Sequence, residues 1–367
     1  MKLKTIIKTF GLAMEMKYSS KILPSHKKAM AAILKCRTED CGEVTVGCPD
    51  CGRIEIFNHS CGHRSCPGCQ NHETTKWIEK QLNKLLPVKY FLVTVTVPCQ
   101  LRDPMWRNQE ESYNALFNSG SAAIREIALN PKYLGGSIGM TGVLHTHARN
   151  LVFHPHIHFI IPGGAIDKKN SVWIKKRGKY LLPWKKLSIL FKGKFLAALK
   201  EAGITFPYSV YRKEWRVNMR DAGNGKTALL YLSKYLYKGV ITEKRIRDNY
   251  DGTVTFSYIE SETDKVRYRT MKGEDFLFHI LQHVLPKDYR RCRDYGFLHG
   301  NAKKTLRLLQ ILLIPKMSTS DDKDSERPMF KCPKCGAGML ILHQTFNKSR
   351  ALGEMIKEIR PILVLCG

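Results

Sequence analysis

Apolar residues recur along this chain with two periods, that of a helix and that of a strand. The segment NHETTKWIEKQLNKLLP (71–87) places Trp77, Leu82 and Leu85 on one side of a predicted helix. We predict further helices over 103–130, 184–202, 227–239 and 274–286, and a basic helical lead-in over 1–30.

Strand-like patterns mark other segments. YFLVTVTVP (90–98) alternates like a strand, and 135–164 predicts two or three strands joined by turns. Residues 252–260 and 265–271 predict a hairpin. The length of 367 residues predicts two or three domains.

Basic residues dominate the charge of the chain. Lys and Arg number 61 against 32 Asp and Glu, which gives a formal net charge of +29. Such an excess favours phosphate-rich partners, nucleic acid first and an anionic membrane surface second. We expect no membrane segment, because the best apolar run (90–98) is far shorter than the roughly 20 residues that a spanning helix needs.

The N-terminal segment lacks the apolar core of a signal peptide, because Lys8 interrupts it. We therefore expect an intracellular, cytoplasmic protein. Cysteines are kept reduced there, so that paired cysteines indicate metal binding rather than disulfides.

Two Cys-X-X-Cys knuckles, CPDC (Cys48, Cys51) and CPGC (Cys66, Cys69), are separated by 14 residues. Four sulfur ligands in a tetrahedron are what a structural zinc ion prefers, and we expect these knuckles to hold one. A closed site of this kind stabilises the fold and has no open position for catalysis. The neighbouring candidates for a second zinc site are Cys36, Cys41, Cys61, His59 and His63.

A third knuckle, CPKC (Cys332, Cys335), is half a zinc site. His343 and Cys366 are the partners that we consider for it. The polar segment Ser318–Pro328, rich in Ser and Asp, precedes the knuckle and predicts a linker.

The segment HPHIHFIIPGG (154–164) carries alternating histidines. Residues i and i+2 of a strand share a face, so His156 and His158 point the same way, while Pro155 indicates that His154 lies where the strand begins. Two imidazoles on one strand face form half of a metal site.

A third imidazole precedes this strand, in TGVLHTHAR. If the two strands form a hairpin, His145 or His147 faces the pair, and we favour His145. Three imidazoles leave coordination positions open on a metal, as catalysis requires.

Two tyrosines follow in a predicted helix, in YLSKY (231–235). Tyr231 and Tyr235 are about one turn apart and share a helix face, and Lys234 and Lys238 flank them as candidate DNA contacts. Beside a metal site in a basic protein, a phenolate is a plausible nucleophile for a phosphodiester, forming a phosphotyrosine. This exchange conserves the bond energy and needs no ATP.

The segment GNGKT (223–227) is consistent with a reaction that needs no ATP, because it does not match the motif of a phosphate-binding loop. Arg220 stands where the first glycine of that motif is required.

Four stretches together resemble a known family. LHTHARNLVFHPHIHFIIPGG, YLSKYLYKGVI, QHVLPKDYRRCRDYGFL and the cysteine cluster ending in CPGCQ resemble, in the same order, the rolling-circle transposases of the insertion sequence 91 type. The resemblance covers roughly residues 25 to 345. These transposases are HUH endonucleases, named after two histidines that flank a hydrophobic residue.

The resemblance implies His156-Ile157-His158 as the HUH motif and Tyr231 and Tyr235 as the nucleophiles. It also implies a catalytic Mg²⁺ or Mn²⁺, an N-terminal domain with structural Zn²⁺, and nicking and joining of single-stranded element ends through 5′-phosphotyrosine intermediates. Ser65 departs from the family pattern, because relatives often carry His there.

The implied fold class is α+β: an antiparallel-sheet HUH domain with a nucleophile helix, preceded by a small zinc-binding domain. We place the boundaries at 1–30 (lead-in), 31–86 (zinc domain and following helix), 87–317 (catalytic domain), 318–328 (linker) and 329–367 (tail).

Other functions are weighed against the transposase reading. A plasmid replication initiator or relaxase would use the same chemistry. A zinc-dependent DNA-binding regulator without catalysis would explain the charge and the knuckles, but not the histidines and paired tyrosines. A metallohydrolase of small substrates would not explain the charge of +29.

Overall fold

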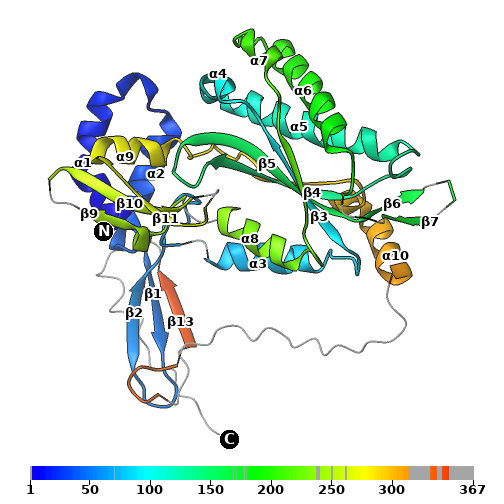
Figure 1. Ribbon diagram of the computed structural model, residues 1–367. Helices are drawn as coiled ribbons and strands as arrows, with labels where there is room; N and C mark the ends of the chain where they lie inside the picture. Colours follow the sequence, from blue (N-terminus) through cyan, green and yellow to red (C-terminus); the bar gives the residue numbers. More distant parts are fainter. Residues whose placement is uncertain are drawn as a thin grey trace, which may run out of the picture.

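The computed structural model describes residues 2–69, 71–167, 169–170, 172–176, 178, 180–236, 240–248, 251–260, 263–313, 331–336 and 341–346, without the side chains of 71, 234, 235, 248 and 341–346. Figure 1 shows a sheet covered by helices on both faces, a helical group beside it, and a narrow β-ribbon that projects away from both. None of the described helices is long and apolar enough to cross a membrane.

The central sheet has five strands in the order β12-β4-β5-β3-β8, and every neighbouring pair is antiparallel. Its central strand, β5, is the histidine strand predicted from the sequence. The strands are β3 (Tyr90–Thr96), β4 (Met140–His147), β5 (Phe153–Pro162), β8 (Val217–Asp221) and β12 (Cys292–Tyr295).

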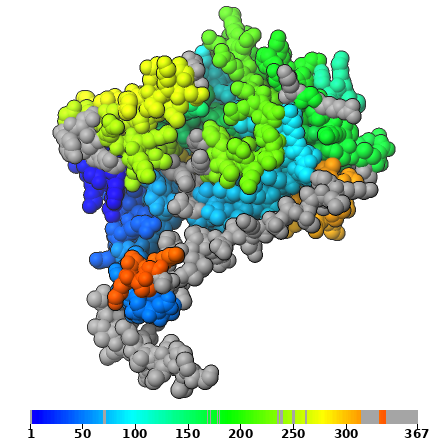
Figure 2. Space-filling view, turned by 60° about the horizontal axis from the view of Figure 1, so that its bottom comes forward, coloured from blue at the N-terminus to red at the C-terminus, as the bar shows by residue number. Residues whose placement is uncertain are grey.

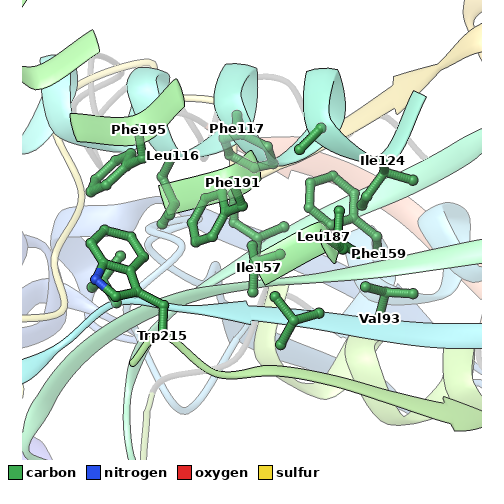
Figure 3. Packing of buried hydrophobic residues seen from close by; sticks show 14 of the residues in the cluster. Val93, Leu116, Phe117, Ile124, Ile157, Phe159, Leu187, Phe191, Phe195 and Trp215 are labelled. Carbon is green, nitrogen blue, oxygen red and sulfur yellow. The ribbon is translucent and has the colours of Figure 1, made fainter. Parts of the chain in front are cut away.

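One face of this sheet packs against helices α5 (Gln109–Leu129) and α6 (Trp184–Glu201). Figure 3 shows rings of Phe117, Phe191 and Phe195 over the strand residues in this layer. Phe159 of β5 fits here because Gly120 and Gly142 have no side chain: a Cβ at either position would lie within 3.0 Å of its ring.

The opposite face packs against α3 (Asn71–Leu82) and α8 (Lys226–Leu236), which lie side by side. This smaller core contains Trp77, Leu92, Val143, Ile160, Leu229, Leu232 and Leu236. It covers only part of the face, and the histidines of β4 and β5 lie on the same side of the sheet.

A second large core packs the N-terminal helices against elements from the later part of the chain. It packs α1 (Leu3–Lys17) and α2 (Pro24–Lys35) against α9 (Gly273–Leu281) and a three-stranded sheet ordered β11-β10-β9. These strands are β9 (Ile246–Asp248), β10 (Thr253–Ile259) and β11 (Val266–Lys272). The predicted lead-in is therefore helical, and it packs on residues more than 200 positions later.

The projecting ribbon is a three-stranded antiparallel sheet in the order β13-β1-β2. Its strands are β1 (Glu43–Gly47), β2 (Ile54–Asn58) and β13 (Ile341–Phe346). A strand from the C-terminal region thus pairs with the N-terminal hairpin.

The smaller elements cap the edges of the body. They are the strand pair β6 (Gly164–Asp167) and β7 (Val172–Lys175) and the helices α4 (Arg102–Arg107), α7 (Ser209–Arg212) and α10 (Lys303–Leu313). Single 3-10 turns occupy Ser19–Lys21, Glu39–Cys41, Cys99–Leu101, Glu243–Arg245, Gly296–Leu298 and Gly300–Ala302.

The predicted α+β class with an antiparallel sheet is confirmed, and so is the hairpin of β10 and β11. The sequence patterns did not identify β8, β12 or the ribbon strands, which are only four to six residues long. The proposed linker 318–328 lies outside the described residues. The domain boundaries stay predictions.

Candidate functional site

Three imidazoles gather on the α8 side of the central sheet. His156 and His158 alternate along β5, and His145 of β4 lies directly opposite His156 in the register. One ring nitrogen from each lies within 4.8 Å of the others. This is the geometry that alternation on one strand face and a hairpin partner predict.

Ring distances show how closely the three side chains meet. The centroid of the His145 ring lies 5.2 Å from that of His156 and 4.4 Å from that of His158. His147 is not in this group, because the β4–β5 register shifts after His145. The ring of His147 lies instead 5.1 Å from that of His283.

Hydrogen bonds orient two of the three imidazoles. His156 Nδ1 donates to the backbone carbonyl of His154 at 2.7 Å, which leaves Nε2 to carry the lone pair. His158 Nδ1 lies 2.8 Å from Thr94 Oγ1 on the adjacent strand β3. Partners of this kind fix the ring orientation of metal-binding histidines.

Burial keeps these imidazoles uncharged. It lowers the pKa of His156 to about 4. Burial and the charges of neighbouring residues also hold the pKa of His145 and of His158 well below the usual range. Because only a neutral imidazole offers a lone pair, the group is a ready donor set for a divalent metal at neutral pH.

Helix α8 begins in a tight glycine turn after β8. Gly225 adopts φ +83°, and a Cβ there would lie 2.8 Å from the Tyr90 ring, so no other residue fits. Asn224 Oδ1 accepts a hydrogen bond from the backbone N–H of Lys226 at 3.1 Å. This turn aims the helix across the histidine face of the sheet.

Tyr231 of α8 is half-buried at the edge of the smaller core. Its ring centroid lies 6.5 Å from that of His158, and the two rings are nearly perpendicular, at 88°. The structure therefore brings one predicted tyrosine beside the three histidines.

The other residues predicted on this helix are only partly described. Lys234 and Tyr235 belong to α8 and follow Tyr231 by three and four residues. The structure does not describe their side chains. Lys238 lies outside the described residues.

Sequence reasoning missed two neighbours of the histidines. Thr94 is one, and Arg220 is the other: it lies on β8, two strands away from β5, and its positive charge helps to lower the pKa of His158. Arg220 is exposed. Neither residue stands in a motif, and only the strand register brings them to the site.

The cysteines form two groups of four, but not those that the sequence suggested. Cys36 and Cys61 lie with the knuckle Cys66–Cys69, and the four sulfurs are within 4.8 Å of one another. The knuckle Cys48–Cys51 lies instead with Cys332 and Cys335 at the same closeness. Each set of four thiol ligands is the donor set of structural zinc.

The expectation that the first two knuckles share one zinc is therefore wrong in this structure. The reason is the hairpin between them: strands of five residues, about 16 Å long, separate the knuckle at its tip from the one at its base. The third knuckle meets Cys48 and Cys51. The two partners that we considered for it, the side chain of His343 and Cys366, lie outside the described part of the chain.

Cys41, His59 and His63, predicted near the second zinc, belong to neither group. The Cys41 thiol donates to the carbonyl of Lys35 at 3.1 Å, and His63 Nδ1 accepts from the backbone N–H of Ser65 at 3.2 Å. Four sulfurs already complete a tetrahedron at each site, so no further ligand is needed.

Comparisons with known proteins agree on one kind of protein. A family model described as "Transposase zinc-binding domain" matches residues 6–97, and one described as "Putative transposase" matches residues 139–305. The second match spans the histidine strand and helix α8.

Two curated relatives match most of the chain. A "Putative transposase y4qJ" from Sinorhizobium fredii is 29% identical, over 93% of this chain and 94% of the relative. The "Transposase for insertion sequence element IS801" from Pseudomonas savastanoi pv. phaseolicola is 26% identical, over 85% of this chain and 82% of the relative. No solved structure gives a significant match.

Proposed function

Because this chain belongs to the insertion sequence 91 family of transposases, enzymes that cut DNA and transfer its strands, we propose that the histidine face and helix α8 form a tyrosine nuclease site for single-stranded DNA. The observation that carries this proposal is the position of Tyr231 beside three converging imidazoles. The centroid of its ring lies 6.5 Å from that of His158. In this account the element moves by rolling-circle transposition.

The reaction is a transesterification at phosphorus. Tyr231 Oη attacks the scissile phosphate, a bond from phosphorus to the phenolic oxygen forms, and the bond from phosphorus to the 3′ oxygen breaks. The leaving 3′ oxygen takes up a proton, and the 5′ end stays on the enzyme as a phosphotyrosine. The number of phosphoester bonds is unchanged, so no nucleotide cofactor is required.

A divalent ion held by His145, His156 and His158 would polarise the phosphate and favour the phenolate. The donor set fits such an ion, because it consists of neutral nitrogens with open positions left for phosphate oxygens. Among the described residues no carboxylate joins this group. Imidazole nitrogens suit Mn²⁺ better than Mg²⁺, which prefers oxygen ligands, so of the two ions we propose Mn²⁺.

Arg220 is the residue that we propose to contact the bound phosphate backbone. It is exposed on the edge strand β8, on the side of the sheet where His158 lies. A guanidinium group binds phosphate with two parallel hydrogen bonds and stays charged. We propose Lys234 and Lys238, which lie in the same segment as Tyr231 and Tyr235, as further DNA contacts.

Tyr235 is the proposed second nucleophile. It follows Tyr231 by four residues in the same helix, a spacing that places both on one face. Joining a cut end to a new strand needs a second transfer, and a second phenol allows it while the first phosphotyrosine persists.

The proposal is tested by removing the metal ligands. We expect His156→Ala and His158→Ala each to lower cleavage of labelled single-stranded element ends by more than about 100-fold, because loss of a mere outer-shell partner already costs 10–100-fold. DNA affinity, which the net charge of +29 mainly provides, should stay close to that of the wild type.

The matched control is His72→Ala, which removes an exposed imidazole in the first turn of α3. It should cleave at the wild-type rate. Normal cleavage by either site variant on a denaturing gel would refute the metal assignment, and no cleavage by any form with Mn²⁺ or Mg²⁺ would favour a non-catalytic DNA-binding protein.

A further inference from the structure

Two copies of one pentapeptide pattern meet at the tip of the projecting ribbon. Cys48-Pro-Asp-Cys-Gly52 lies in the turn of the hairpin β1–β2, and Cys332-Pro-Lys-Cys-Gly336 precedes β13. The knuckle at Cys66 differs, because its second cysteine is followed by Gln70. Cys51 of the first copy faces Cys332 of the second, although the two residues are 281 positions apart in the sequence.

The two turns also have the same conformation. The backbone N–H of Gly52 donates to the carbonyl of Cys48 at 3.0 Å, and that of Gly336 donates to the carbonyl of Cys332 at 2.9 Å. Both glycines adopt a positive φ, +65° and +70°. The ribbon tip is therefore built from two equivalent half-sites.

The distances between sulfurs fit a tetrahedral metal site. Cys48 Sγ lies 3.7 Å from Cys335 Sγ, and Cys51 Sγ lies 3.7 Å from Cys332 Sγ. Sulfurs bound to one zinc at about 2.3 Å lie about 3.8 Å apart, from the geometry of a tetrahedron. A disulfide would require about 2.05 Å, so the four thiols are arranged for a metal and not for oxidation.

Strand pairing brings the half-sites together. β13 pairs with β1 over its whole length, from Glu43 opposite Phe346 to Gly47 opposite Ile341. Gly47 directly precedes Cys48, so the pairing ends where the first knuckle begins. Figures 1 and 2 both show the C-terminal segment, in orange, against the blue hairpin at the end of the projection.

We infer that Cys48, Cys51, Cys332 and Cys335 bind a zinc ion that fastens the C-terminal segment to the N-terminal ribbon. The ribbon is then one zinc unit assembled from both ends of the chain, with the catalytic sheet in the intervening sequence. The family match to a zinc-binding domain, residues 6–97, contains only half of its ligands. The inference is independent of the proposed DNA chemistry.

Zinc counting tests the composition of the site. We expect the full chain to lose one zinc per molecule in Cys48→Ser/Cys51→Ser, and also one in Cys332→Ser/Cys335→Ser. The variant with all four substitutions should again lose only one, because both pairs serve the same ion. Cys41→Ser, which changes a nearby cysteine outside both groups, should lose none.

The same count can overturn the inference. An unchanged zinc content in Cys332→Ser/Cys335→Ser would show that the C-terminal knuckle is no ligand. A loss of two zinc ions in the fourfold variant would show that the two pairs hold separate ions.

A second measurement tests the fastening itself. A protease site is inserted between Ser318 and Pro328, the purified full chain is cut, and the pieces are separated by gel filtration. The C-terminal piece should stay attached, and it should separate when the same cut is made in Cys332→Ser/Cys335→Ser. The inference would be contradicted if the C-terminal piece separated from the cut wild-type chain while zinc was bound. It would also be contradicted if the piece stayed attached in the cut variant.

Discussion

At the scale of residues, the site depends on groups that hold the histidines as much as on the histidines themselves. Thr94 Oγ1 lies 2.8 Å from His158 Nδ1, on the strand next to β5. The hydroxyl fixes the ring so that its other nitrogen points to the proposed metal. Thr94 is therefore a positioning residue, which touches neither metal nor DNA in this account.

Replacing Thr94 tests this role. We expect Thr94→Val, which keeps the shape but loses the hydroxyl, to weaken Mn²⁺ affinity and cleavage by about 10–100-fold. Thr94→Ser should restore most of both. The readout is the Mn²⁺ concentration that gives half-maximal cleavage; an unchanged value in Thr94→Val would mean that the hydroxyl does not orient His158.

Residues in local patterns were predictable, whereas their long-range partners were not. The alternation of His156 and His158 and the spacing of the two tyrosines follow from strand and helix periods. Thr94 and Arg220 reach the site only through strand pairing, which no local pattern encodes. The predicted cysteine grouping was wrong for a related reason. A glycine follows the knuckles Cys48–Cys51 and Cys332–Cys335 but not Cys66–Cys69, whereas proximity in sequence favoured pairing the first two knuckles.

At the scale of elements, helix α2 contains a buried histidine in its first turn. His26 Nδ1 accepts a hydrogen bond from the backbone N–H of Leu23 at 3.3 Å, and the ring stacks 5.6 Å from that of Trp106. Burial lowers the pKa of His26 from 6.5 to about 4. The unfolded chain therefore takes up this proton first as the pH falls.

This shift makes the helix sensitive to acid. The stability that neutral His26 contributes is fully present above about pH 6.5 and is lost as the pH falls toward 4. His26→Gln keeps an acceptor at this capping position and removes the titration. Between pH 7 and pH 5 we expect the unfolding free energy to fall by about 2 kcal/mol less in the variant than in the wild type.

Denaturant unfolding of both proteins at the two pH values checks this prediction. If wild type and His26→Gln lose the same free energy, the imidazole is not buried in its neutral form.

At the scale of the whole molecule, the described residues form three parts with different roles in this account. The central sheet carries the histidines, the core around α1, α2 and α9 joins distant parts of the chain, and the ribbon projects from them. The net charge of the chain, +29, suits a partner with many phosphates. The family assignment and the geometry of the sheet both support our central proposal, that a tyrosine of α8 attacks DNA beside the histidines.

The most direct test of that claim is to map the covalent adduct. Wild-type protein is incubated with a single-stranded element end and Mn²⁺, digested, and analysed by mass spectrometry for the peptide that carries DNA. We predict attachment to Tyr231 or Tyr235, no adduct in Tyr231→Phe/Tyr235→Phe despite normal DNA binding, and a normal adduct in Tyr208→Phe, which changes an exposed tyrosine outside α8. Attachment to any other residue, or an adduct that survives the double substitution, would contradict the account.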